Sequence, residues 1–139
     1  MQLYDSMTHI LLDARNRQRE IRFIDGERDE SVLSFAELYS EATGLLGALQ
    51  SRGMRPGDEL VIFTRSNRKF VVSFWAAILG GIVPVPVAVG ISDEHRFKLF
   101  RILRQLDRGT LYTETELLER LQRFASEQAL PDISSILAE

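Results

Sequence analysis

The sequence has 139 residues, of which 45% are hydrophobic and 27% are charged. These proportions are typical of one globular domain and exclude an intrinsically disordered or fibrous chain. The formal net charge of -3 argues against nucleic acid or a membrane surface as the main partner. Cysteine is absent, which excludes disulfides, thiol nucleophiles and cysteine-based zinc sites and favours a cytoplasmic location.

The first third of the chain predicts an amphipathic helix and a small hairpin. Residues 6–17 have apolar side chains at helical spacing, namely Met7, Ile10, Leu11 and Ala14. Strands over 21–24 and 31–33 flank Asp25-Gly26, a pair that tolerates the positive φ of a hairpin turn. The hairpin is therefore expected close to the N-terminus.

The middle of the chain predicts a helix and then a strand, helix and strand in succession. Ser34 and Glu37 have the spacing of a capping box, which starts a helix that runs to residue 51 and is ended by Gly53. An apolar strand over 59–64 follows. A helix over 67–80 is apolar nearly all round, so it is expected to be buried on most sides.

The apolar stretch over 70–89 has the length of a membrane span. It is interrupted by Gly80-Gly81, Pro84 and Pro86, so a buried helix followed by a strand over 82–87 explains it better. No membrane span is therefore predicted.

The last third repeats the alternation. A helix capped by Ser92 or Asp93 extends to 107, and a short strand covers 110–112. Thr113-x-x-Glu116 has the spacing of a second capping box, and a strand over 133–137 follows the next helix. This order predicts a single α/β domain over 1–139, with a mostly parallel sheet covered by helices on both faces.

The sequence contains no complete catalytic site. Neither phosphate-loop spacing nor a GxGxxG pattern occurs, and His9 and His95 are too far apart in sequence to form a helical metal pair. Ser73 lacks the flanking glycines of a nucleophile elbow. We therefore assign no catalytic, cofactor-binding or metal-ligating residue.

Two acidic clusters are not predicted to form a catalytic pair, because nothing apolar surrounds them to raise a carboxyl pKa. The first is interpreted as a solvated hairpin loop and the second as acidic residues favourably placed at a helix N-terminus. These residues are Glu27, Asp29 and Glu30, then Glu114, Glu116 and Glu119.

Two further features have two interpretations each. The helix over 92–107 has a basic stripe, which is either a docking patch for an acidic partner or the solvated side of the helix. Its residues are Arg96, Lys98, Arg101, Arg104 and Arg108. Thr64-Arg65-Ser66-Asn67 joins a strand end to a helix start, so it is either an anion site or an ordinary helix cap.

Several motifs, taken in order, resemble the opening of the adenylate-forming enzymes. They are Ser34-Phe-Ala-Glu-Leu, Gly53-x-x-Pro56-Gly57-Asp58, the strand over 60–64, and Phe74-Trp-Ala-Ala-Ile-Leu-Gly-Gly-Ile-Val-Pro-Val-Pro-Val. This superfamily includes acyl-CoA synthetases, fatty acyl-AMP ligases and the adenylation domains of nonribosomal peptide synthetases. Pro84-x-Pro86 and the basic helix after it are most similar to the fatty acyl-AMP ligase branch.

The resemblance implies a parent enzyme that uses ATP and Mg²⁺ to convert a carboxylate into an acyl-adenylate and pyrophosphate. The acyl group then passes to CoA or to a carrier protein. The phosphate loop and the later nucleotide motifs of the family are missing here, so the resemblance implies an N-terminal portion that is inactive alone, in which Trp75 packs a core.

The partner of this portion would be the remainder of the parent enzyme, and the isolated piece is expected to self-associate. The alternative is a stand-alone binding or dimerisation module without catalysis.

Overall fold

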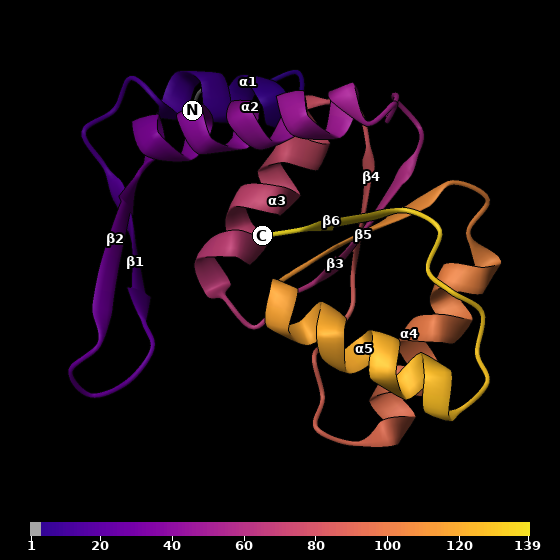
Figure 1. The fold of residues 1–139 in the computed structure, drawn as a ribbon. Helices are drawn as coiled ribbons and strands as arrows, with labels where there is room; N and C mark the ends of the chain where they lie inside the picture. Colours follow the sequence, from indigo (N-terminus) through magenta and orange to yellow (C-terminus); the bar gives the residue numbers. More distant parts are fainter. Residues whose placement is uncertain (1–3) are drawn as a thin grey trace.

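The structure is a computed structural model that describes residues 4–139. A four-stranded parallel sheet has the order β4-β3-β5-β6 and lies between two layers of helices (Figure 1). The strands are β3 (Glu59–Phe63), β4 (Val83–Pro86), β5 (Gly109–Thr113) and β6 (Ile136–Ala138). The predicted parallel sheet is confirmed, although its last strand begins three residues later than the sequence suggested.

One helical layer contains α1 (Met7–Ala14), α2 (Phe35–Ser51) and α3 (Asn67–Leu79), and the other contains α4 (Asp93–Gln105) and α5 (Thr115–Glu127). The antiparallel hairpin of β1 (Glu20–Ile24) and β2 (Glu30–Ser34) projects to one side (Figure 1). Among residues 4–139, no helix is long and apolar enough to cross a membrane.

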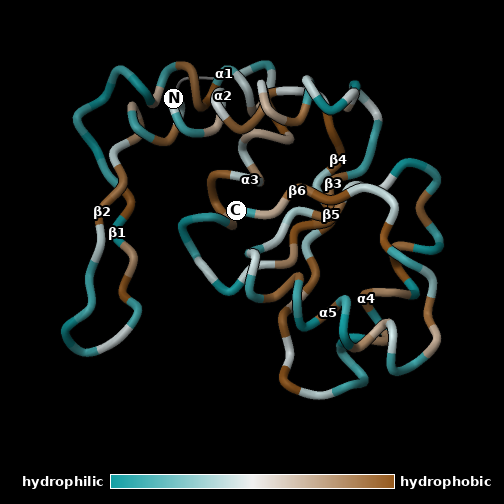
Figure 2. The backbone as a smooth tube through the Cα atoms, viewed as in Figure 1, coloured by the Kyte–Doolittle hydropathy of each residue, from teal (hydrophilic) through white to brown (hydrophobic). Residues whose placement is uncertain are grey.

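The central strands β3 and β5 are buried on both faces. Leu60 and Ile62 of β3 join the core under α1, α2 and α3, whereas Val61 and Phe63 join the core under α4 and α5. Alternate residues of a strand point to opposite faces, so a nearly continuous apolar run is required in a sheet covered on both sides. β3 has such a run over Leu60–Phe63, whereas β5 has one strongly hydrophobic residue, Leu111 (Figure 2).

Local signals set the ends of α2 as predicted. The Ser34 hydroxyl accepts a hydrogen bond from the Glu37 amide at 3.1 Å, and the Glu37 carboxylate accepts one from the Ser34 amide at 2.8 Å. Gly53 has φ of 91°, the left-handed conformation in which glycine carries no steric penalty.

Two predicted turn and cap details are wrong, and a third is confirmed in position only. Gly26 is not among the positive-φ residues, because the hairpin connection is wider and the Asp25 amide donates to the Asp29 carbonyl. Thr113 ends β5 and makes no capping bond, since its side chain is buried in the sheet and Glu114 takes the N-cap position of α5. Ser92 takes the N-cap position of α4, as predicted, but among the described residues its hydroxyl contacts His95 Nδ1 at 2.6 Å and makes no capping bond to a backbone amide.

Burial differs from the prediction in two helices. α1 buries only Leu11, while Met7 and Ile10 stay 43% and 42% exposed. α3 has one fully buried face instead of being buried on most sides, because no described element covers its outer side; Trp75 packs against the core but is only partly buried, and Phe70 is exposed.

The β4 edge of the sheet is occupied by proline. The amides of Val83 and Val87 donate inward to carbonyls of the β3 side. Pro84 and Pro86 alternate with them, so the nitrogens that face outward have no hydrogen to donate. This edge therefore cannot accept another strand in regular register.

Candidate functional site

The best candidate site is the crevice between the carboxyl ends of β3 and β5. The helix after β3 is α3, which covers one face, and the helix after β5 is α5, which covers the other. β3 and β5 are neighbours in the sheet, so their connections diverge at this point. Ligands of open α/β sheets bind in the crevice that such a divergence creates.

Glu114 bridges the two sides of this crevice. Its Oε1 accepts hydrogen bonds from the Thr64 hydroxyl at 2.6 Å, the Arg65 amide at 3.1 Å and the Ser66 amide at 3.2 Å. The Ser66 hydroxyl also caps α3 by accepting from the Lys69 amide at 3.2 Å. Residues 64–66 therefore combine both sequence interpretations: they form a helix cap, and the anion they bind is a carboxylate of the same chain.

The Glu114 carboxylate lies at the N-terminus of α5, as predicted, but it is also sheltered. Within residues 4–139 its Oε2 is buried without a hydrogen-bond partner, as is the hydroxyl oxygen of the preceding residue, Thr113. The sequence gives no local signal for this bridge, because Glu114 and Thr64 are 50 residues apart and meet only when β5 pairs with β3. Glu116 lies in the first turn of α5, as predicted, and both Glu116 and Glu119 are exposed.

An open hollow of about 420 Å³ adjoins the bridge and is lined by both acidic and basic side chains, including Arg65, Arg120 and Glu139. The Tyr112 hydroxyl donates to the Glu139 carboxylate at 3.0 Å, and the Lys69 ammonium donates to the Glu139 carbonyl at 2.9 Å. Burial, and next the nearby Glu139 carboxylate, raise the pKa of Tyr112 well above its usual range. Two guanidinium groups at this opening can attract an anion.

The other candidate residues do not converge on the crevice. The Ser73 hydroxyl is buried and donates to the Phe70 carbonyl at 3.1 Å. His9 lies on α1 and His95 near the start of α4, each beside a neighbour in its own segment. Glu27, Asp29 and Glu30 are exposed in or beside the hairpin loop, as predicted. A hydroxyl and an imidazole meet at Ser92 and His95, 2.6 Å apart, but this exposed pair lies at the start of α4 and not in the crevice.

The basic stripe is divided by the fold. Arg96 pairs with Asp93 and lies 5.6 Å from the centre of the Phe124 ring. α4 ends at Gln105, so Arg108 follows the helix and lies 3.6 Å from Asp58. Arg101 and Arg104 are exposed on α4.

The described residues offer no metal centre. Within residues 4–139, no three His, Asp or Glu side chains lie close enough together to hold a metal ion. These residues thus supply no three-ligand cage for Mg²⁺, an ion that proteins commonly hold through one or two carboxylates together with substrate phosphates.

Known proteins match most of this chain. The sequence pattern of a family described as "AMP-binding enzyme" matches residues 12–133. A putative fatty-acid–CoA ligase of Mycobacterium tuberculosis is 33% identical over 89 residues, which are 59% of this chain and 15% of that protein. A long-chain-fatty-acid–AMP ligase of Mycobacterium marinum is 23% identical over 120 residues, which are 84% of this chain and 19% of that protein. The chain thus spans less than a quarter of either relative.

Solved structures share the fold. The adenylation domain of a keto acid-selecting nonribosomal peptide synthetase module, bound to keto acyl adenylate, superposes with a TM-score of 0.88 and 26% identity over 99% of this chain and 26% of that chain. A fatty acid AMP ligase from Legionella pneumophila superposes with a TM-score of 0.75 and 17% identity over 83% of this chain and 20% of that chain. At that lower identity, the second likeness concerns the fold alone.

We predict that Glu114→Ala lowers the free energy of unfolding by about 2 kcal/mol, because a charged acceptor of three hydrogen bonds is lost. Glu114→Gln keeps an acceptor oxygen and should cost less. Glu116→Ala, in the exposed first turn of the same helix, is the matched control and should cost below about 1 kcal/mol. Urea unfolding measures all three, and equal losses for Glu114→Ala and Glu116→Ala would contradict the bridge.

A second prediction concerns alkaline pH. The pKa of Tyr112 is raised in the folded protein, so the unfolded chain loses this proton first, and stability should fall as pH rises above about 10. Tyr112→Phe should cost about 1 kcal/mol at pH 7 through the lost hydrogen bond. Its disadvantage should shrink between pH 9 and pH 11. Urea unfolding of both proteins at each pH tests this, and parallel stability curves would refute it.

Proposed function

Because the chain belongs to the AMP-binding enzyme family, we propose that it forms the N-terminal portion of an ATP-dependent ligase that activates a carboxylate. In the proposed reaction, a carboxylate oxygen bonds to the α-phosphorus of ATP, pyrophosphate leaves, and an acyl-adenylate forms. The observation that carries the proposal is the family match over residues 12–133, which includes both central strands and all the helices after α1.

The proposed role of this portion is structural, and it is inactive by itself. The doubly covered sheet holds the crevice between β3 and β5, and Glu114 fixes the two turns that border it. No phosphate loop occurs in the sequence. ATP and Mg²⁺ are therefore expected to bind with residues of the longer enzyme, and the remainder of that enzyme is the principal partner.

We further propose the fatty acyl-AMP ligase branch, or a synthetase loading domain, with a fatty acid as substrate and CoA or a carrier protein as acceptor. The order of motifs through Pro84-x-Pro86 and the match to a long-chain-fatty-acid–AMP ligase over 84% of the chain support this finer assignment. The cysteine-free sequence supports a cytoplasmic location.

The activity test compares two proteins. The 139-residue chain alone should show no carboxylate-dependent exchange between ATP and labelled pyrophosphate. The same chain joined to its natural continuation should show exchange with fatty acids, and the acyl group should then pass to CoA or to a carrier protein. Exchange by the chain alone, or a continuation without a phosphate loop, would defeat the proposal.

We also propose that the isolated chain self-associates. α3 exposes part of Phe70, whose ring lies 6.3 Å from the ring of the partly buried Phe74, and exposed apolar surface of this kind promotes association. Light scattering from micromolar to millimolar concentration should show species larger than a monomer. Phe70→Lys should reduce them, whereas Ile91→Lys, which changes the 89% exposed Ile91 in a loop, should not. A monomer at every concentration would refute the proposal.

A further inference from the structure

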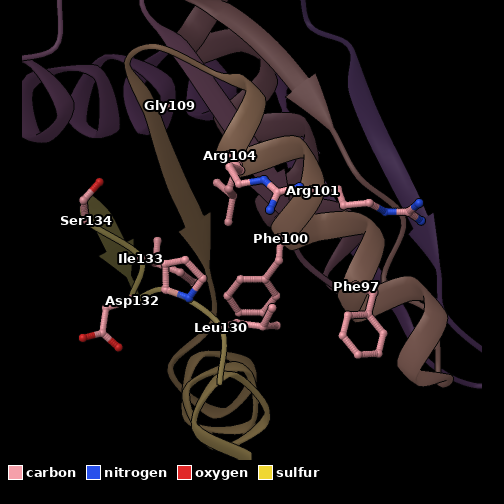
Figure 3. A pocket seen from close by; sticks show the side chains of 11 residues that line it. Phe97, Phe100, Arg101, Arg104, Gly109, Leu130, Asp132, Ile133 and Ser134 are labelled. Carbon is pink, nitrogen blue, oxygen red and sulfur yellow. The ribbon is translucent and has the colours of Figure 1, made fainter. Parts of the chain in front are cut away.

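A second cavity lies at the amino end of β5, whereas the crevice lies at the carboxyl ends of β3 and β5. It has a volume of about 250 Å³ and is enclosed by α4, by Gly109 at the amino end of β5, and by the segment over 130–134 that leads to β6 (Figure 3). The volume gives room for roughly eight groups of the size of a water molecule. A small ligand therefore fits it.

Most of the side chains that line this cavity are apolar. Phe97 and Phe100 come from α4, and Leu130 and Ile133 come from the facing segment (Figure 3). Phe100 belongs to the core under α4 and α5, and its ring centre is 6.1 Å from that of Phe124. The floor is thus held by the core, whereas Phe97 at the mouth is 37% exposed. Such a lining favours the unbranched hydrocarbon part of a ligand.

The mouth of the cavity is basic. Arg101 and Arg104 border it, and neither guanidinium has a hydrogen bond or ion pair within residues 4–139. Asp132 also borders the cavity, but its carboxylate points away from the Phe100 ring and from Arg104 (Figure 3). In Figure 3 the Arg101 guanidinium points away from Leu130 and Ile133, so the charge that an outside anion meets at the mouth is that of Arg104.

A polar hollow continues from the same place. It shares Leu103, Gly109 and Ser134 with the apolar cavity. Three arginines and two aspartates also line it, namely Arg52, Arg55, Arg108, Asp58 and Asp107. Arg108 has a carboxylate neighbour, Asp58, at 3.6 Å, whereas the Arg55 side chain has no partner within residues 4–139. The apolar cavity thus adjoins a polar hollow in which Arg55 offers a further unpaired guanidinium group.

From this juxtaposition we propose that the cavity between α4 and residues 130–134 binds an amphipathic anion, an unbranched alkyl chain of about eight carbons that ends in a carboxylate or a phosphate. The alkyl chain of the ligand lies against Phe97, Phe100, Leu130 and Ile133, and its head group bonds to Arg104. Guanidinium groups bind both carboxylate and phosphate through paired N–H donors. This site goes beyond the proposed function, because the cavity lies at the amino end of β5 and shares no side chain with the crevice at the carboxyl ends of β3 and β5.

The test measures binding to the 139-residue chain by isothermal titration calorimetry. Octanoate and octyl phosphate test the two head groups. Octanol lacks the anionic head group, and inorganic phosphate lacks the alkyl chain. We expect one saturable site per chain for at least one anion, with octanol about tenfold weaker, as the loss of a charge-assisted hydrogen bond implies. If only one of the two anions binds, the proposal is supported and that result identifies the head group.

Substitutions at the cavity test whether the anion binds there. Arg104→Gln should weaken binding of the anion about tenfold, and Phe97→Ala should weaken both the anion and octanol. Arg123→Gln, which changes an exposed arginine on α5, is the matched control and should leave binding unchanged. Amide chemical shifts should move at Gly109 and Ser134. Equal effects of Arg104→Gln and Arg123→Gln, or shifts confined to the hairpin and α3, would overturn the proposal.

Discussion

The double burial of β3 and β5 is the constraint on which the rest of this structure depends. A strand whose two faces are both covered needs helices on both sides of the sheet. The chain meets this need by sending α3 to one face and α4 and α5 to the other. Because α3 follows β3 on one face and α5 follows β5 on the other, the connections after these two strands diverge. The crevice is therefore a direct result of covering both faces of the sheet.

Glu114 gives this crevice its chemical character. A carboxylate that accepts from Thr64, Arg65 and Ser66 already uses the donors that an outside anion would otherwise find at the start of α3. An incoming anion must therefore interact with the guanidinium groups at the opening, such as Arg65 and Arg120. The bridge also joins two turns that are distant in sequence, which makes the border of the crevice one connected unit.

Much of the fold could be predicted from the sequence because its signals are local. The Ser34 capping box, Gly53 and the alternation of apolar strands with helices depend on near neighbours in the chain. The Thr113 cap failed because a hydroxyl in a capping pattern was taken into a buried strand. The Glu114 bridge and the cavity beside Arg104 were not predictable, since each requires segments that meet only through strand pairing or helix packing.

The prolines of β4 limit how copies of this chain could join. Hydrogen-bonded extension of a sheet into a long fibre requires a receptive strand at both margins, as in a repeating stack. Pro84 and Pro86 leave one margin without outward donors, so only the side of β6 can add a strand. Growth by this route stops once two copies have met through β6, which protects a sheet rich in valine and isoleucine from open-ended polymerisation.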